Sequence, residues 1–285
     1  QIADTISPTP GWITSYRAES TEDAAFCSGA ALCHLHLAMG QGSLPLALIR
    51  DRLALRAAEA LMAQSGRPER AAELRDAVLL LRPGDLPGPA GEVWLAWRRA
   101  VNRPLSPGSL HRAMPEIGLD RIARWLDAGE GPPPGRAAAV LETVLAEAPR
   151  AEVPALILAD AALAQALGWD RLLPLLAIGL KRGDLRKRGA DLRFACHRAA
   201  ASSAIEAVRL AADLSRRAAH LKAVAPRLRA KGAGEAVEMF LTRDAVAPSA
   251  LPLPDRAGRR LCDRLIDLGA IRELTGRDTF RLYGI

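Results

Sequence analysis

Alanine- and leucine-rich runs with a helical period fill most of this chain, and no other feature constrains its fold as strongly. Apolar residues make up 49% of the 285 residues, but aromatic residues only 4%. Ala and Leu rank high in helix propensity, whereas a β-sandwich or barrel would need more Val, Ile, Thr and Tyr. The composition therefore predicts an all-α protein with a substantial core.

Prolines and glycines divide these runs into segments of helix length. We expect an irregular multi-helix bundle of antiparallel helix pairs, because the chain shows no self-similarity at a fixed period. Trp94 and Trp97, three residues apart, should face the core of this bundle. The expected helices span residues 21–39, 44–63, 68–81, 89–97, 106–128 with a break at Gly118, 136–148, 154–167, 171–180, 185–200, 202–220, 233–243 and 255–268.

Changes in composition divide the chain into three parts. Residues 1–20 hold prolines and a glycine within a few positions and predict an irregular lead-in. Residues 21–231 predict a helical domain, which the proline- and glycine-rich stretch 129–135 could subdivide. Residues 232–285 predict a smaller, winged-helix-like domain that ends in a β-hairpin.

The predicted helix at residues 255–268 has clear start and stop signals. Asp255 can cap its first turn, and Gly269 can take the left-handed conformation that ends a helix. The buried stripe, at i, i+4 and i+7, would consist of Leu261, Leu265 and Leu268.

Two β-like runs follow this helix, at residues 271–274 and 279–283, on either side of a turn that contains Gly276. They predict a two-stranded hairpin. An isolated hairpin is only marginally stable, so we expect it to pack on the preceding helix with Phe280 and Leu282 inward. A helix followed by such a hairpin is typical of the second half of a winged helix-turn-helix.

The charges on the exposed face of this helix oppose its macrodipole. Arg256, Arg259 and Arg260 lie near its positive start, and Asp263 and Asp267 near its negative end. This order costs about 0.3–1 kcal/mol per exposed group. It suits a helix whose first turns contact phosphates or guanine edges. Local pairing of Arg259 and Arg260 with Asp263 is the alternative explanation.

Three stretches of the chain resemble an uncharacterised bacterial family, domain of unknown function 1403. They are LRDAVLLLRPGDLPGPAGEVWLAWRR (74–99), AVAPRLRAKGAGEAVEMFLTRDAV (223–246) and LPDRAGRRLCDRLIDLGAIRELTGRDTFRLYGI (253–285). The last stretch is also similar to winged helices attached to some bacterial Fic-type proteins, but the Fic catalytic loop is absent. The family has no established activity, so this resemblance implies a fold and not a function.

The segment before the last helix departs from a regular helix-turn-helix. A regular motif has a full helix before the recognition helix. Here residues 247–254, APSALPLP, leave room for about one turn. Helix-and-wing units also serve as protein docking modules, which keeps a protein partner open as an alternative.

Positive charge is concentrated in one block of the sequence. Residues 171–231 carry 15 basic and 4 acidic side chains, within a chain whose net charge is +7. Such a block indicates a polyanionic partner, most often nucleic acid. Its densest run, 181–188, lies in a predicted loop and could contact phosphates at the edge of a DNA footprint.

We therefore predict a DNA-binding accessory or regulatory protein. The alternative is a non-enzymatic protein–protein adaptor that docks an acidic partner, and the sequence gives no oligomeric state. The predicted contacts to duplex DNA are Lys181, Arg182, Arg186, Lys187, Arg188, Arg256, Arg259, Arg260 and Arg277.

Cysteine and histidine gather in one short stretch that contains Cys27, Cys33, His34 and His36. Cys33 and His36 could share a helix face, but the other two fall elsewhere on the helical wheel. A tetrahedral zinc site needs four converging ligands. We therefore expect ordinary buried or half-buried side chains here, and neither a metal nor a cofactor.

Arg75, Asp76, Arg82 and Asp85 flank a proline- and glycine-rich turn that is expected to join two helices. The turn lacks the strand and the Gly-Lys-Ser/Thr ending of a phosphate-binding loop. We expect an ion-pair cluster that fixes the turn, and a functional role for it stays open. Known hydrolase and protease motifs are missing, so an enzyme is the least favoured class.

The hydropathy pattern predicts no contact with a membrane. The longest apolar run, at residues 172–180, is far shorter than the roughly 20 residues of a spanning helix. A secretory pattern is also missing. We therefore expect a cytoplasmic protein.

Overall fold

The computed structural model describes residues 6–15, 17–67, 69–277 and 279–285, and most of them are helical. Single turns of 3₁₀ helix lie at Asp184–Arg186, Ala225–Arg227 and Pro248–Ala250, and the strands are β1 (Arg272–Glu273) and β2 (Tyr283–Gly284). The predicted all-α class is confirmed. The helices are α1 (Gly11–Thr14), α2 (Thr21–Met39), α3 (Leu46–Gln64), α4 (Ala71–Leu79), α5 (Gly88–Val101), α6 (Pro107–Ala113), α7 (Leu119–Asp127), α8 (Pro133–Glu147), α9 (Glu152–Ala166), α10 (Leu175–Gly179), α11 (Gly189–Val224), α12 (Ala233–Thr242) and α13 (Asp255–Asp267).

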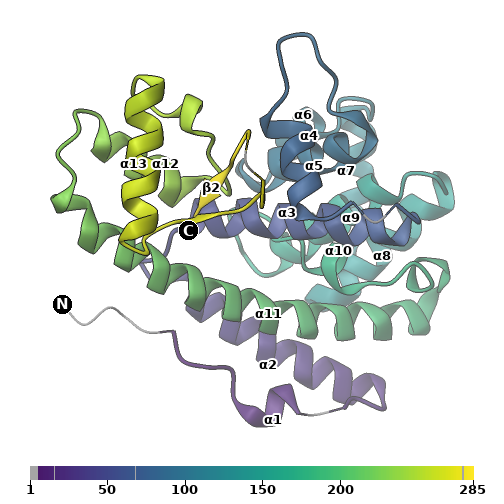
Figure 1. Cartoon of the computed structure of the whole chain (residues 1–285). Coiled ribbons are helices and arrows are strands. Elements are labelled where there is room, and N and C mark those ends of the chain that lie inside the picture. The colour runs from purple at the N-terminus through teal and green to yellow at the C-terminus, as the bar shows by residue number, and fades with distance from the viewer. Residues whose placement is uncertain (1–5, 16, 68, 278) are drawn as a thin grey trace.

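A single long helix organises the bundle. α11 has 36 residues and runs along one side of the molecule, with α2 packed beside it (Figure 1). α3 packs against α5 across the middle of the molecule, α8 packs against α9, and α13 stands near the C-terminal end of α11 (Figure 1). In the described part of the chain, no helix combines the length and apolar character needed to cross a membrane.

The sequence predicted two helices at residues 185–200 and 202–220, but α11 begins only at Gly189 and then continues without a break to Val224. Ser202 does not interrupt it, because the hydroxyl of Ser202 donates a hydrogen bond to the carbonyl oxygen of Ala199, 3.1 Å away. A serine bonded back in this way stays compatible with a helix. The segment between Ala190 and Val224 holds neither Pro nor Gly, so nothing in it forces a break.

The predicted helix at residues 171–180 shrinks to the five residues of α10. Pro174 precedes it, and Asp160 of α9 supplies the cap that the local sequence lacks. The Asp160 carboxylate accepts hydrogen bonds from the backbone N–H groups of Leu176, at 2.8 Å, and Ala177, at 3.2 Å. Asp160 is fully buried, so this contact fixes α10 to α9 inside the core.

One hydrophobic core extends through the bundle and into the C-terminal segment. Trp94 and Trp97 are fully buried, as their spacing predicted. The same cluster of buried side chains includes Val246, Tyr283 and Ile285. The last residues of the sequence therefore share a core with the helices, and the predicted domain boundary at residues 231 and 232 stays a prediction.

α13 has most of its predicted features. Leu261 and Leu265 are buried, Leu268 is half-buried, and Gly269 ends the helix with a φ of +65°. The expected cap by Asp255 is wrong, because Pro254 takes the N-cap position and makes no side-chain hydrogen bond there.

The hairpin after α13 is shorter than predicted. Arg272 pairs with Gly284 and Glu273 with Tyr283 in antiparallel register, and Val246 adds a bridge to Tyr283. Leu282 is buried as expected. The inward orientation predicted for Phe280 is wrong, because its side chain is 69% exposed and its φ is +53°. A positive φ is rare for a bulky residue, and here it turns the chain outward before Leu282.

The burial of Asp160 predicts a stability that depends on pH. Burial raises the pKa of Asp160 to about 8, although the backbone N–H donors oppose the shift. An unfolded chain has an Asp pKa of about 3.9. Between these values the folded protein holds a proton that the unfolded chain lacks, so the free energy of unfolding should fall as pH rises through this range.

In Asp160→Asn this part of the pH dependence should disappear. Urea unfolding at pH 5 and pH 8 measures it, with Asp213→Asn on the surface of α11 as the control. Identical pH dependence in the wild type and Asp160→Asn would contradict the interpretation.

Candidate functional site

α13 presents its predicted arginines to solvent. Arg256, Arg259 and Arg260 are exposed, and no described side chain forms an ion pair or hydrogen bond with any of them. The expected alternative, local pairing of Arg259 and Arg260 with Asp263, is therefore not present. Asp255 in the first turn and Arg264 in the last turn suit the helix dipole, so the unfavourable position of the three arginines is only partly offset within α13.

Further exposed cations lie beside α13. The loop before α12 packs against the residues just before α13, since a Cβ added at Gly232 would lie 2.9 Å from the carbonyl oxygen of Pro252. We call the following exposed residues, which have no ion-pair partner among the described residues, the C-terminal cations: Lys222, Arg227, Arg229, Lys231, Arg243, Arg256, Arg259, Arg260 and Arg264.

Six of the C-terminal cations were not singled out from the sequence. Four of them lie inside the basic block at 171–231, so the charge pattern contained their signal but did not show where they lie. The close approach of residues 231–232 to residues 252–253 is a tertiary contact, which a charge count cannot predict.

The predicted contacts at 181–188 lie between the ends of other helices. Arg182 donates a hydrogen bond to the carbonyl oxygen of Gln64, at the end of α3. Lys187 pairs with Asp184 at 2.7 Å, and the Arg188 guanidinium donates to two backbone carbonyl oxygens. Lys181 and Arg186 are exposed, and neither side chain has a partner in the described part of the chain.

These residues and α13 lie at opposite ends of α11. Gly189, at the start of α11, directly follows the 181–188 run. Near the other end, His220 donates a hydrogen bond of 2.9 Å to the carbonyl oxygen of Leu268, at the end of α13. The helix between Gly189 and His220 is about 47 Å long at 1.5 Å per residue. The structure therefore does not bring the two predicted sets of cations together.

Arg277, the predicted contact at the tip of the hairpin, is held against the body of the protein. Its two terminal nitrogens donate to the carboxylate of Asp76 on α4 at 2.7 and 2.6 Å. A bidentate pair of this kind is among the stronger side-chain contacts. The hairpin is thereby attached to α4 at its turn.

The cluster expected around the turn at 82–91 does not form as one group. Asp76 pairs with Arg277, and Arg75 points into the core toward Asp244. Asp85 stays local and accepts a hydrogen bond from the backbone N–H of Arg82, 3.0 Å away. All four residues therefore have a structural contact, Arg82 through its backbone only, and the contacts of Arg75 and Asp76 join α4 to the C-terminal segment.

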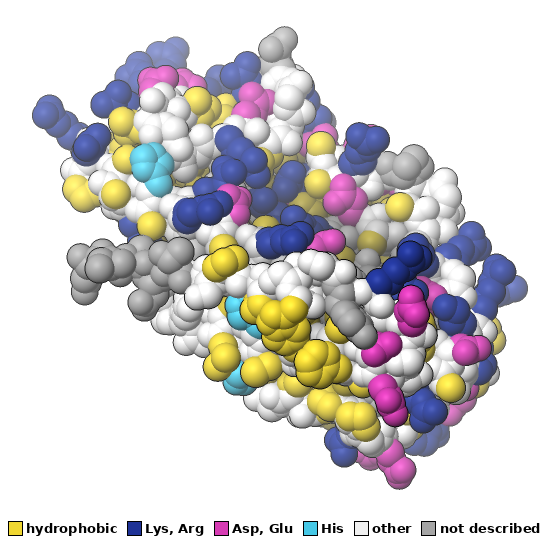
Figure 2. All heavy atoms as spheres, turned by 90° about the horizontal axis from the view of Figure 1, so that it is seen from below, with side chains coloured by type: hydrophobic (Ala, Val, Ile, Leu, Met, Phe, Trp, Pro, Cys, Tyr) yellow, Lys and Arg dark blue, Asp and Glu magenta, His cyan; other side chains and the backbone are white. Residues whose placement is uncertain are grey.

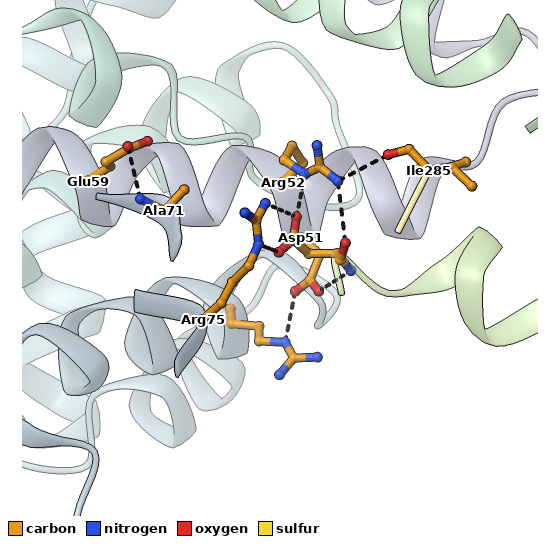
Figure 3. Close-up of polar contacts among 8 residues, drawn as sticks. Asp51, Arg52, Glu59, Ala71, Arg75 and Ile285 are labelled. Carbon is orange, nitrogen blue, oxygen red and sulfur yellow. Dashed lines mark hydrogen bonds and ion pairs between the residues drawn. The ribbon is translucent and has the colours of Figure 1, made fainter. Parts of the chain in front are cut away.

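Asp244 lies at the centre of a buried network of charged groups that the sequence did not indicate. Figure 3 labels Asp51, Arg52 and Arg75 of this network. Arg52 of α3 pairs with one carboxylate oxygen of Asp244, and Arg75 of α4 donates to both oxygens at 2.6 and 3.0 Å. The backbone N–H of Asp244 donates to Asp51, which also accepts from Arg98 of α5 at 2.8 Å. Three helices are thus connected through one residue that follows α12.

The network also holds the last residue of the sequence. Arg52 donates hydrogen bonds to the backbone oxygens of Asp244 and Ile285, at 3.3 and 3.4 Å. Burial alone would raise the pKa of Asp244, but Arg75 and Arg52 outweigh it and hold that pKa below its usual value. At Asp51 burial is the larger effect and raises the pKa, although Arg98 opposes it.

An apolar patch lies on the face formed by α1 and α2. Trp12, Phe26 and Leu37 are 56%, 64% and 65% exposed, and the rings of Trp12 and Phe26 are 5.6 Å apart. Figure 2, which views the molecule from this side, shows hydrophobic side chains gathered there beside histidines. Exposed apolar groups in contact with each other are typical of interaction surfaces.

The Cys and His side chains of α2 have separate environments. Cys27 is buried and Cys33 is exposed. His34 bonds to Thr9 and to the carbonyl oxygen of Ser7, and His36 accepts a hydrogen bond from Trp169. Within the described ranges, no group of three or more His, Cys, Asp or Glu side chains could hold a metal ion.

The structure defines a mostly helical protein whose last helix is followed by a two-stranded antiparallel hairpin. The chain belongs to the family described as "Protein of unknown function (DUF1403)", whose family model matches residues 1–285. The resemblance inferred from three stretches of the sequence is confirmed as membership of this family. A search of curated proteins finds no match.

The Asp244 network predicts a large effect of one substitution. Asp244→Ala would leave Arg52 and Arg75 buried without their shared carboxylate, so we expect a loss of about 3–5 kcal/mol in the free energy of unfolding. Asp213→Ala, which removes the partner of Arg216 and Arg217 on the surface of α11, should cost less than about 1 kcal/mol. Urea unfolding measures both, and equal small losses would contradict the central role of Asp244.

Proposed function

We propose that this protein is a DNA-binding accessory or regulatory protein that contacts duplex DNA through the C-terminal cations and a winged-helix-like unit at residues 232–285. One observation supports the proposal most. All nine C-terminal cations are exposed, and none has an ion-pair partner among the described residues. A duplex carries one negative charge per roughly 1.7 Å of its axis, so a group of unpaired cations suits it as a partner.

The position of the arginines on α13 adds to this argument. Arg256, Arg259 and Arg260 lie in the first turns, where each exposed cation costs about 0.3–1 kcal/mol. The described residues form no ion pair with these arginines, and only Asp255 in the first turn and Arg264 in the last turn offset part of this cost. Contacts between the start of α13 and phosphates or base edges would account for the arrangement.

The shape of the C-terminal unit limits how it could bind. The hairpin follows α13 as a wing would, but the segment before α13 forms only the single turn Pro248–Ala250. Arg277 is bound to Asp76, so a wing contact to DNA would have to break that pair. The proposal therefore places the main phosphate contacts on α13 and on residues 222–231.

The predicted contacts at 181–188 would serve as a second, flanking set. A duplex that follows α11 would need about 14 base pairs to cover the 47 Å between the two ends, at ~3.4 Å per base pair. The members of that run with exposed side chains that form no ion pair in the described part of the chain are Lys181, Arg182, Arg186 and Arg188.

A protein–protein adaptor remains the second candidate, but its surface favours a partner with an apolar face over the acidic partner that the basic block suggested. The observation that favours the adaptor is the exposed apolar patch of Trp12, Phe26 and Leu37. This patch lies on the α1 and α2 face, away from α13, so the two candidates involve different surfaces (Figure 1).

The DNA proposal predicts a specific loss in the triple variant Arg256→Ala, Arg259→Ala, Arg260→Ala. Affinity for a duplex should fall about tenfold or more, and the slope of log affinity against log salt should become shallower by about 0.9 for each lost phosphate contact. A mobility-shift titration at two salt concentrations measures both quantities. The matched control has the same change of charge on α7 and α8: Arg121→Ala, Arg124→Ala and Arg136→Ala.

Equal losses in the two triple variants would mean that net charge alone attracts DNA, and would contradict a site on α13. No binding of the intact protein to any duplex at low salt would reject DNA as the partner. The adaptor candidate instead predicts that Trp12→Ser with Phe26→Ser abolishes capture of a protein partner, while the α13 variant retains it.

A further inference from the structure

A cavity separate from the charged surfaces lies between α2, the turn before α8, the first half of α8 and the start of α11. Its volume is about 1010 Å³. Small and apolar side chains form most of its wall, among them Ala25, Leu32, Ala138 and Leu167. Pockets for small molecules are typically concave and mostly apolar, with a few polar groups that fix the orientation of the ligand.

Gly29 keeps one wall of this cavity open. It lies in the middle of α2, where Gly costs about 1 kcal/mol relative to Ala. Neighbouring atoms do not require it, because a Cβ added at Gly29 would meet no atom within 4 Å. Its φ is also not in the left-handed region. Helix stability and packing therefore do not explain a glycine here, whereas space for a ligand would.

A buried polar pair, formed by Ser28 of α2 and His197 of α11, also lines the cavity. The Ser28 hydroxyl and Nδ1 of His197 are 2.7 Å apart, and Ser28 also donates to the carbonyl oxygen of Ala25. Both residues are more than nine-tenths buried and line the cavity. Because the Ser28 hydrogen is used by Ala25, Nδ1 of His197 is the donor in this pair. The ring is held in one orientation, with Nε2 left as a hydrogen-bond acceptor.

The charged side chains near His197 determine which polar group of a ligand the cavity can hold. Arg193 precedes it by one turn of α11, lines the cavity and has no partner among the described residues. Burial, and then the positive charge of Arg193, lower the pKa of His197, so Arg193 carries the charge at neutral pH. The other polar side chains of the lining are Thr21, Cys33, His36, Glu130 and Glu142.

One of the two acidic residues in this set, Glu142, is directed toward the start of α11. Glu142 accepts a hydrogen bond of 3.1 Å from the backbone N–H of Gly189, so its charge meets the positive start of α11. Glu130 belongs to the turn before α8. An acyl-transfer site is not indicated, because Ser28 lies in the middle of α2, where backbone N–H groups are bonded within the helix and cannot stabilise an oxyanion.

We propose that this cavity binds a small amphipathic molecule with a carboxylate head, which contacts Arg193, and an apolar chain, which lies against α2 at Gly29. The complementarity of one unpaired guanidinium with a mostly apolar wall favours this class over a cation or a neutral molecule.

Three probes with the same ten-carbon chain and different head groups test the proposal: decanoate, decanol and decylammonium. Isothermal titration calorimetry of the full chain, below the concentration at which each probe forms micelles, should show saturable binding of decanoate. Its affinity should exceed that of decanol by roughly tenfold, the usual value of a charge-assisted contact. Decylammonium should bind most weakly.

Two variants, each with a matched control, locate the probe. Gly29→Leu fills the opening and should lower decanoate affinity at least tenfold, whereas Gly234→Leu, also at a helical glycine with open space, should leave it unchanged. Arg193→Gln should abolish the preference for decanoate over decanol, whereas Arg209→Gln, further along α11, should retain it. Both Gly→Leu variants should fold, because neither added side chain meets an atom near its Cβ.

Each contrary result overturns a defined part of the proposal. No saturable binding of any probe to the wild type rejects the site. Decanoate binding that is equal in Gly29→Leu and Gly234→Leu places the probe elsewhere. A decanoate preference that survives Arg193→Gln, or tighter binding of decylammonium, rejects the assigned head group.

Discussion

The carboxylate of Asp244 is the contact on which the arrangement of this protein depends. It lies just after α12, yet it binds the guanidinium groups of Arg52 on α3 and Arg75 on α4. Its backbone N–H extends the network to Asp51 and, through it, to α5. Replacing a buried ion network by apolar groups is often neutral or stabilising, whereas removing one partner is costly. We interpret this network as fixing one arrangement of the C-terminal segment on the bundle.

The attachment of the C-terminal segment to the bundle determines where the candidate DNA-binding helix α13 lies. The pair of Arg277 with Asp76 and the contact of His220 with Leu268 hold the hairpin and the end of α13 at two further points. These contacts therefore fix the position of α13, and with it the unpaired arginines of its first turns, relative to the helical bundle. The amphipathic-ligand cavity lies on different helices, so a partner at α13 and a ligand beside α2 would not compete for the same residues.

Local patterns in the sequence predicted the helices well, together with the end of α13 at Gly269 and the burial of Trp94 and Trp97. They could not predict that α11 continues through Ser202, because a serine weakens a helix without forcing it to end. Asp244 and Arg75 are 169 residues apart, and no periodic pattern records a pair at that distance. Seven of the nine predicted cations are exposed, whereas Lys187 and Arg277 are half-buried and ion-paired. The separation of the predicted cations along α11 depended on a helix longer than the sequence suggested. The sequence alone did not predict the cavity. A glycine within a helix, such as Gly29, can be related to a cavity only when the open space beside its Cα is known.

Hydrogen exchange of the wild-type protein, followed by mass spectrometry under native conditions, tests the central claim most directly. If the Asp244 network joins the C-terminal segment to the bundle, peptides covering residues 244–246 and 282–285 should exchange only through the same global opening as peptides from α3. Their opening free energies should then agree and should fall together as denaturant is added. Exchange of the C-terminal peptides through an opening of much lower free energy, while α3 stays protected, would contradict the claim and show that the segment is an independent unit.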